Sequence, residues 1–508
     1  IQATGFNYDA DNKLVPIANA PGFATIYNYD IYGNLTSTTD PLGLSTSGTY
    51  DTDGLYLTSS TDKNGKVTNY TYYDGSASTN PVGALSSATI DSPTDSSGIT
   101  TSYTYNHYNQ KTTITDDLGN TTDLNYDGNR KRLTRVLPDG ATTTFSYYPA
   151  RDIVSGALVQ NETDALGNFA TFKYDKTGNM TSREDRNGNI TTYSYDGLNR
   201  LIAETDPFQN SAELSYDGNG NVVKQTDKNG NVTNFVYDAA NRLITKRDPE
   251  GNDFDYEYYA DGKLKNEIYT VNTTKVKTHY DYNALGHPEA RTISNDDGSG
   301  DTREFQYRYD ALGRLIKTIY PKGNYETIEY DYNGNTRYTR SFDSLGNPLK
   351  QVEFIYYADS RNLLQKKIVD NGKDDSGDGY IYEYDALGRL LRETDPVGNH
   401  VDYEYDSVGN LVRLTDGAGN ITQHFYDLAG KKVKTIDANN STTPVTYDNN
   451  GNPLKVTDRE GNETTAFYDA MNRRIGVMDT QWNTTTFDYD ENGNLIGLTD
   501  PNSGSTLY

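Results

Sequence analysis

The sequence contains no cysteine, one tryptophan, three methionines and five histidines among its 508 residues. The absence of thiols excludes disulfides, thiolate nucleophiles and cysteine-held zinc or iron–sulfur sites. Five histidines leave little material for a histidine-based active site. No apolar run approaches the ~18–20 residues of a membrane span. The acidic excess, 72 Asp and Glu against 46 Lys and Arg, argues against nucleic acid or an anionic membrane surface as a partner.

Tyrosine is abundant, with 45 residues against 14 phenylalanines, and it recurs at a fixed step. Tyr-Asp pairs or their equivalents are 21 residues apart over 174–258 and again over 384–489. Such a period is typical of repeat proteins, and the chain holds roughly 22 copies. We therefore expect a single repeat region over 1–508, an excerpt of a larger protein. Longer insertions are expected near 75–98, 150–158, 293–303 and 370–379.

Each copy carries two turn signals. Four residues after the tyrosine, the regular copies have only Gly or Asn, which accept positive φ most readily, so Asp-x-x-Gly predicts a type I turn closed by a left-handed residue. Eleven residues after the tyrosine the same copies all have Asp, which starts a second turn. The second turn is expected to be less strictly specified, because Gln209, Trp482 and Ser503 stand where Gly or Asn is usual.

Two strands of about six residues fit between these turns. The alternation around Tyr403 and Tyr405 suits a strand with tyrosine on one face. The predicted fold is all-β: tandem ~21-residue hairpins forming one continuous antiparallel sheet, which must curl into a hollow shell or a solenoid. Tyrosines of one face are expected to stack from copy to copy. A β-propeller would need about 12 blades where 4–8 is typical, and alternate copies show no difference, so we exclude it.

Two aspartates per repeat are expected to cap turns, and the sequence singles out no carboxylate pair for catalysis. We therefore expect no enzyme, no catalytic residue and no cofactor-binding residue. Calcium is the one ion considered, at the lengthened loop that contains Asp370, Asp374, Asp375 and Asp378. The residues expected to hold the repeat together are Tyr195, Asp196, Asp206, Tyr384, Asp385, Gly388, Asp395, Tyr405, Asp406, Gly409 and Asp416.

The segment YDALGRL at 384–390, followed by TDPVGN at 394–399, resembles the YD repeats of the rearrangement-hotspot (Rhs) family. Similar repeats occur in the B and C components of Tc insecticidal toxins, in bacterial wall-associated proteins and in teneurins. The resemblance implies a β-strip that spirals into a hollow shell, secreted or displayed on the surface of a bacterial cell. In the toxin members such a shell encloses a C-terminal toxic domain, and in teneurins it belongs to an adhesion ectodomain.

Three functions remain open from the sequence. The first is a non-enzymatic scaffold that encloses or presents another module of the same polypeptide. The second is a surface module that binds a glycan or a receptor, although the single tryptophan counts against it. The third is a filament subunit that associates with copies of itself.

Overall fold

The computed structural model describes residues 7–8, 14–15, 25–75, 80–90, 98–149, 158–271, 274–357, 361–370, 379–502 and 504–507. The chain divides into two compact units, each made of two stretches of sequence. The first unit comprises residues 1–121 and 257–402, and the second comprises 122–256 and 403–508. Each unit is described by itself below.

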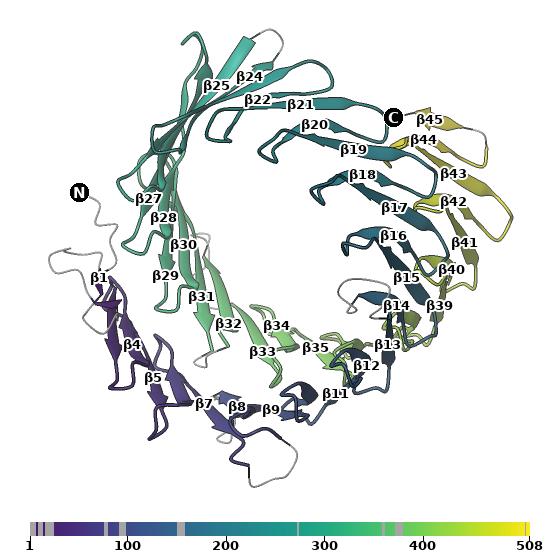
Figure 1. The fold of residues 1–508 in the computed structure, drawn as a ribbon, viewed down its shortest axis with the longest axis horizontal. Coiled ribbons are helices and arrows are strands. Elements are labelled where there is room, and N and C mark those ends of the chain that lie inside the picture. Colours follow the sequence, from purple (N-terminus) through teal and green to yellow (C-terminus); the bar gives the residue numbers. More distant parts are fainter. Residues whose placement is uncertain are drawn as a thin grey trace. The chain divides into compact units, whose positions relative to one another are not determined.

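Every regular element of the described residues is a strand (Figure 1). In the first unit the strands are β1 (Asn7–Tyr8), β2 (Leu14–Val15), β3 (Ile26–Tyr29), β4 (Leu35–Thr39), β5 (Ser45–Tyr50), β6 (Leu57–Thr61), β7 (Val67–Tyr72), β8 (Leu85–Ile90), β9 (Ile99–Tyr105), β10 (Lys111–Thr115), β24 (Leu264–Val271), β25 (Thr274–Tyr282), β26 (Pro288–Asn295), β27 (Arg303–Tyr309), β28 (Leu315–Ile319), β29 (Tyr325–Tyr330), β30 (Thr336–Phe342), β31 (Pro348–Tyr356), β32 (Leu364–Asp370), β33 (Tyr380–Tyr384) and β34 (Leu390–Thr394).

In the second unit the strands are β12 (Arg132–Val136), β13 (Thr142–Tyr147), β14 (Val159–Thr163), β15 (Phe169–Tyr174), β16 (Met180–Glu184), β17 (Ile190–Tyr195), β18 (Leu201–Thr205), β19 (Ser211–Tyr216), β20 (Val222–Thr226), β21 (Val232–Tyr237), β22 (Leu243–Arg247), β36 (Leu411–Thr415), β37 (Ile421–Tyr426), β38 (Lys432–Ile436), β39 (Thr442–Tyr447), β40 (Pro453–Thr457), β41 (Glu463–Tyr468), β42 (Arg474–Met478), β43 (Thr484–Tyr489), β44 (Leu495–Thr499) and β45 (Ser505–Leu507). The boundaries between the units fall within β11 (Thr121–Tyr126), β23 (Asp253–Tyr258) and β35 (His400–Tyr405).

Within each unit a strand pairs antiparallel with its neighbours in the sequence. Strand β17, for example, pairs with β16 before it and with β18 after it. Between β17 and β18, Ser194 lies opposite Ala203, but Tyr195 lies opposite Leu201, so one extra residue forms a bulge. Tyr195 is the last residue before the first turn of its copy, and we call the tyrosine at this position the anchor tyrosine. A type I turn followed by a left-handed residue and a bulge is a common three-residue hairpin loop. The predicted tandem of antiparallel hairpins is confirmed.

The left-handed positions lie where the sequence places them. Asn199 has φ 61°, Gly388 has φ 80° and Gly409 has φ 96°. The second turn has the same backbone even where Gly and Asn are absent, since Gln209 has φ 71° and Trp482 has φ 66°. The expectation of a looser second turn is therefore wrong at these two positions: the residue varies while the geometry does not. Ser503 lies outside the described residues.

The lengthened copies extend their strands. Strands β24, β25 and β26 have eight, nine and eight residues, against five or six in a regular hairpin such as β17–β18. The insertion expected near 293–303 is the end of β26, a turn and the start of β27. The other three insertions fall mostly on residues outside the described part: 76–79, 91–97, 150–157 and 371–378.

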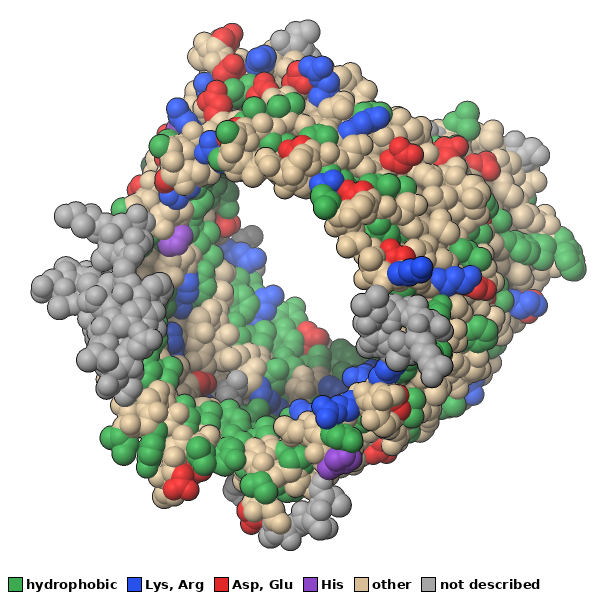
Figure 2. All heavy atoms as spheres, in the orientation of Figure 1, with side chains coloured by type: hydrophobic (Ala, Val, Ile, Leu, Met, Phe, Trp, Pro, Cys, Tyr) green, Lys and Arg blue, Asp and Glu red, His purple; other side chains and the backbone are tan. Residues whose placement is uncertain are grey.

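The sheet is one layer thick and has no deep core. In the described part, the only buried hydrophobic side chains are Ala84, Ile99, Leu124, Ala141, Ala170 and Val352. On the visible face of Figure 2, acidic and basic side chains are both spread among polar and hydrophobic ones. Because little apolar area is buried, hydrogen bonds made by turns and tyrosines carry an unusual share of the specificity.

We expect Gly409→Val to destabilise its hairpin by about 1–3 kcal/mol, because a β-branched residue is strained at positive φ. A Cβ at Gly409 would meet no atom within 4 Å, so the loss reports backbone strain without a clash. Gly409→Asn is the matched control, since Asn199 already occupies the equivalent position at φ 61°. Thermal unfolding followed by circular dichroism measures both. Equal midpoints for the two variants would contradict the assigned turn.

Candidate functional site: the turn ladder and the seam

Most of the described hairpin loops are built around the carboxylate of their first residue. Asp196 Oδ1 accepts hydrogen bonds from the backbone N–H groups of Leu198 (2.8 Å) and Arg200 (3.0 Å). The backbone N–H of Asn199 bonds to the carbonyl of Asp196 at 3.0 Å. The second turn repeats this arrangement, with Asp416 Oδ1 accepting from Ala418 and Asn420 at 2.9 Å each. Both turns of a repeat are therefore closed by the same aspartate motif.

The second carboxylate oxygen binds the side chain four residues later, and this side chain alternates between copies. Arg200 Nε donates to Asp196 Oδ2 at 2.7 Å, whereas Asn221 Nδ2 donates to Asp217 Oδ2 at 2.8 Å. Arginine reaches the next hairpin through the carbonyl of Asp217 (3.2 Å). Asparagine does so through Oδ1 of the next left-handed Asn, as between Asn221 and Asn241 (2.9 Å). The expectation that alternate copies show no difference is wrong, because Asn alternates with Arg or Lys at this position.

The hydroxyl of the anchor tyrosine joins neighbouring hairpins. Tyr216 donates to the carbonyl of Leu201 at 2.7 Å and Tyr195 to that of Met180 at 3.0 Å, each 15 residues earlier. The described anchors that make this bond include Tyr50, Tyr72, Tyr147, Tyr195, Tyr216, Tyr330, Tyr426, Tyr447, Tyr468 and Tyr489. Phenylalanine cannot donate it, which is a reason for the excess of tyrosine.

The expected stacking of tyrosine on tyrosine takes another form in several regular copies. The guanidinium of Arg200 lies 4.5 Å from the ring centre of Tyr216, and Arg314 lies equally far from Tyr330. Three Tyr–Tyr ring contacts among the described residues occur where a second tyrosine replaces the turn aspartate. Tyr357 meets Tyr384 edge-on at 6.1 Å, for example. In these copies the second tyrosine also donates to a carbonyl of the next hairpin, as Tyr357 does to Tyr382 (2.9 Å).

The predicted anchor residues lie at these positions. Tyr384 and Tyr405 end β33 and β35. Asp385 and Asp406 open first turns, and their second oxygens accept from Arg389 (2.6 Å) and Asn410 (2.9 Å). The second-turn residues Asp395 and Asp416 each accept from the Asn four residues later, at 2.9 Å.

Asp206 differs from these aspartates because it is almost fully buried, with 2% of its surface exposed. Its Oδ1 accepts from the turn N–H groups of Phe208 (2.9 Å) and Asn210 (3.0 Å). Its Oδ2 lies 3.3 Å from Nζ of Lys228, in the next repeat. Asp40 and Lys63 form the same kind of pair at 2.6 Å. In these copies a basic residue of the next second turn stands in for the asparagine cap.

The turn bonds also set the charge state of the aspartates. Bonds from the side chains of Asn179 and Thr177 lower the pKa of Asp175 to about 2 from 3.8. Bonds from Asn494 and Asn229 lower the pKa of Asp490 to about 2 in the same way. Burial raises the pKa of the Tyr384 phenol above its ordinary value. These aspartates are ionised hydrogen-bond acceptors at neutral pH, which suits turn closure and leaves no proton to donate.

A feature that the sequence reasoning missed lies within the second unit. Residues 122–256, here called row A, meet residues 403–508, here called row B, along their turns; we call this junction the seam. Asn187 Nδ2 donates to Asp448 Oδ2 at 2.9 Å across 261 residues of sequence. Asn450 Nδ2 returns a bond of 2.8 Å to Asp185 Oδ2. The sequence feature that could have predicted the seam is Asn at the third position of some turns, in the motif Asp-x-Asn-Gly.

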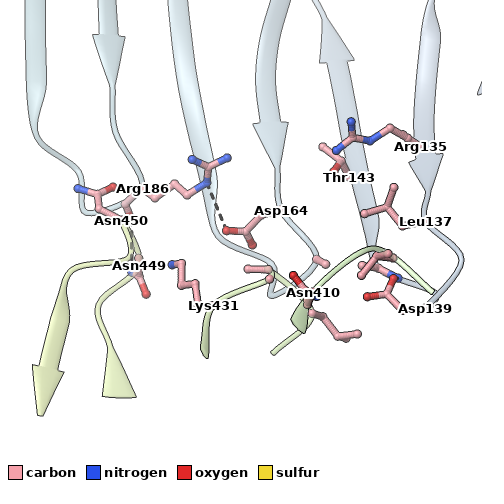
Figure 3. A pocket seen from close by; sticks show the side chains of 16 residues that line it. Arg135, Leu137, Asp139, Thr143, Asp164, Arg186, Asn410, Lys431, Asn449 and Asn450 are labelled. Carbon is pink, nitrogen blue, oxygen red and sulfur yellow. Dashed lines mark hydrogen bonds and ion pairs between the residues drawn. The ribbon is translucent and has the colours of Figure 1, made fainter. Parts of the chain in front are cut away.

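A cavity of about 340 Å³ opens on the seam (Figure 3). Its lining includes Arg135, Asp164 and Arg186 from row A and Leu428 and Lys431 from row B. Arg186 Nε lies 3.3 Å from Asp164 Oδ2, the ion pair drawn as a dashed line.

The expected calcium loop is described only at its start. Asp370 ends β32, while Asp374, Asp375 and Asp378 lie outside the described residues. Among the residues that the structure does describe, no three His, Asp or Glu side chains are grouped so that they could hold a metal ion. The same part of the chain has no helix of the length and hydropathy needed to cross a membrane.

Comparison with known proteins identifies the repeat. The family RHS Repeat matches residues 174–210, 216–253, 384–421 and 405–442. No curated protein matches the sequence. Among solved structures, TcdB2-TccC3 is 13% identical, with 97% of this chain and 38% of that chain covered and a TM-score of 0.30. A Tc holotoxin pore of Photorhabdus luminescens is 12% identical, with 97% and 39% covered and a TM-score of 0.29. The chain thus spans about two fifths of these chains.

We expect Tyr216→Phe to lower the free energy of unfolding by about 0.5–1.5 kcal/mol, the usual net worth of one hydrogen bond. The variant removes only the hydroxyl that bonds to Leu201 (2.7 Å). Tyr332→Phe is the control, because Tyr332 is 62% exposed and its hydroxyl has no bond to a described residue. Urea unfolding measures both variants. Equal losses would show that the hydroxyl does not link hairpins.

We expect the melting temperature to be level from pH 7 to 5 and to fall as the pH drops from about 4 to about 2. The sign follows from the lowered pKa of Asp175 and Asp490, about 2 against 3.8. Their ionised forms bind better in the folded chain, so the gain is complete above 3.8 and is lost as folded carboxylates take up protons. Circular dichroism melts across this range test it. A fall centred above pH 5 would point to other groups.

Proposed function

Since this chain carries tandem RHS repeats, we propose that it is a non-catalytic structural scaffold, a wall of β-hairpins that encloses or presents another part of a longer secreted polypeptide. The wall is one layer thick, so it can surround a volume without filling it. The observation that carries this proposal is the seam, where two rows of hairpins are hydrogen-bonded edge to edge within one unit.

A single-layer sheet is suited to this role only if its margins are closed. An open row of turns would leave gaps between successive rows, through which a protease or water-soluble ligand could pass. The bonds of Asn187 and Asn450 tie the margin of row A to that of row B. Ion pairs such as Arg186–Asp164 line the cavity that remains there. This closure supports a wall better than a surface that presents repeated binding sites.

The carboxylates of the repeat also favour a structural role over catalysis. Hydrolysis by paired carboxylates needs one of them protonated near neutral pH. The turn bonds instead lower the pKa of Asp175, Asp196, Asp395 and Asp416. Bonds to the backbone and side chain of Arg200 do so for Asp196, and the side chains of Asn399 and Asn420 do so for the other pair.

The test is electron microscopy and protease protection of the longest natural polypeptide that contains this sequence. We expect single hollow bodies, with an internal segment that resists protease until urea opens the wall. The control is the same digestion in urea, where the segment should disappear. Long fibres of stacked copies would favour the filament, and saturable binding on a glycan array, lost on Tyr→Ala substitution of one face, would favour the surface module. Either result would overturn the scaffold.

A further inference from the structure

The contacts of the seam are reciprocal and repeat along it. Asn229 Nδ2 donates to Asp490 Oδ2 at 2.8 Å, and Asn492 Nδ2 donates to Asp227 Oδ2 at 2.7 Å. The backbone N–H of Lys228 bonds to Asn492 Oδ1 at 2.9 Å. The backbone N–H of Asn492 bonds in turn to Asn229 Oδ1 at 3.0 Å, across 263 residues. We call such a pair of turns, joined by two exchanged Asn–Asp bonds, a clasp.

The two clasps of the second unit share one sequence motif, Asp-x-Asn-Gly. Row A contributes Asp-Arg-Asn-Gly at 185–188 and Asp-Lys-Asn-Gly at 227–230, which are second turns. Row B contributes Asp-Asn-Asn-Gly at 448–451 and Asp-Glu-Asn-Gly at 490–493, which are first turns. The first unit contains half of the same arrangement independently. There, Asn333 Nδ2 in Asp-Tyr-Asn-Gly donates to Asp62 Oδ2 in Asp-Lys-Asn-Gly at 3.0 Å.

Between the clasps the facing turns carry apolar residues at their two central positions. The turn at 206–209 carries Pro207 and Phe208, and it lines a cavity of about 410 Å³ together with Ala470 and Met471 of row B. The guanidinium of Arg473 lies 5.7 Å from the ring centre of Phe208. Two hairpins earlier, Ala165 of row A and Leu428 of row B line the other seam cavity.

At the two clasps polar turns therefore face polar turns, whereas the turn with Pro207 faces the one with Ala470 and Met471. A slip of one hairpin would set the amides and carboxylates of each clasp against Phe208, Met471 or Leu428. Those polar groups would lose their partners where they are partly buried, which costs more than the bonds gain elsewhere. The pattern thus disfavours a one-hairpin slip.

We propose that the turn motif Asp-x-Asn-Gly is a recognition element with which one row of RHS repeats binds another. The clasps set the register of the seam, that is, which hairpin of row A faces which hairpin of row B. The partner that fits this surface is a second row carrying the same motif, and its acceptor is the Oδ2 of the turn aspartate. The inference rests on the proposed scaffold, since it concerns how the wall closes, but it makes a separate claim about which hairpins meet.

Asn219 provides a matched control for Asn450 inside the chain. It occupies the third position of Asp-Gly-Asn-Gly at 217–220, and its Nδ2 donates to Asn241 Oδ1 at 3.0 Å. Asn450 makes the same bond within its row, to Asn472 Oδ1 at 2.8 Å, and in addition bonds to Asp185. Among the described residues, Asn219 bonds to no other row. Comparing substitutions at 219 and 450 therefore isolates the bond across the seam.

The experiment is thiol cross-linking of the full chain, whose lack of cysteine makes every introduced pair unambiguous. The reporter pair is Pro207→Cys with Ala470→Cys, which lies between the clasps and leaves all four asparagines in place. The pair displaced by one hairpin is Pro207→Cys with Glu491→Cys, since Glu491 lies 21 residues after Ala470 at the same place in its turn. With a short bifunctional maleimide, we expect the reporter pair to cross-link and the displaced pair to do so at least tenfold more slowly, as an ordered seam requires.

Into the reporter chain we introduce Asn187→Ala with Asn450→Ala, Asn450→Asp, or the control Asn219→Ala. Loss of the clasp should slow cross-linking by about three- to tenfold. Asn450→Asp should do the same without a change of size, because it sets a carboxylate against that of Asp185. Asn219→Ala should leave the rate unchanged. Equal rates in all four chains, or equal rates for reporter and displaced pairs, would overturn the clasp even if hollow bodies are still seen by microscopy.

Discussion

The bond between a turn aspartate and the backbone N–H groups of its own loop is the interaction on which the rest of the structure depends. In a sheet one layer thick there is no second layer to fix the direction of the chain. Each loop must therefore return the strand by its own local chemistry. Asp196 does so with two accepted N–H bonds while Asn199 takes the left-handed conformation. Where turns of this kind close both ends of a strand, the strand pairs with its neighbours in the sequence, as β17 does.

Links between hairpins are built on top of these loops. The hydroxyl of Tyr216 reaches back 15 residues to Leu201, and Arg200 reaches forward to the carbonyl of Asp217. Both use groups that a flat ribbon would leave exposed to water. Each such bond contributes about 0.5–1.5 kcal/mol. Repeated along the chain, they join one hairpin to the next.

The seam extends the same chemistry to a longer range. Its donors are asparagine amides and its acceptors are aspartates already held by their turns, so the carboxylates are oriented before the rows meet. The low pKa of Asp490 reflects bonds from Asn494 in its own turn and from Asn229 in the other row. A carboxylate that closes a loop and also joins two rows links local folding to assembly of the wall.

The sequence by itself determined the hairpin, the two turns and the order of the strands, because all of these depend on residues within one 21-residue copy. Gly409 predicted its own positive φ, and Asp406 its own turn. Only the tertiary structure decided that Asn187 meets Asp448, 261 residues away. Which turn of one row faces which turn of the other depends on the number and the length of the copies between them, including copies with longer strands such as β24–β26. Neither quantity can be read from a single repeat. The local sequence also does not distinguish an asparagine that bonds to another row from one that does not.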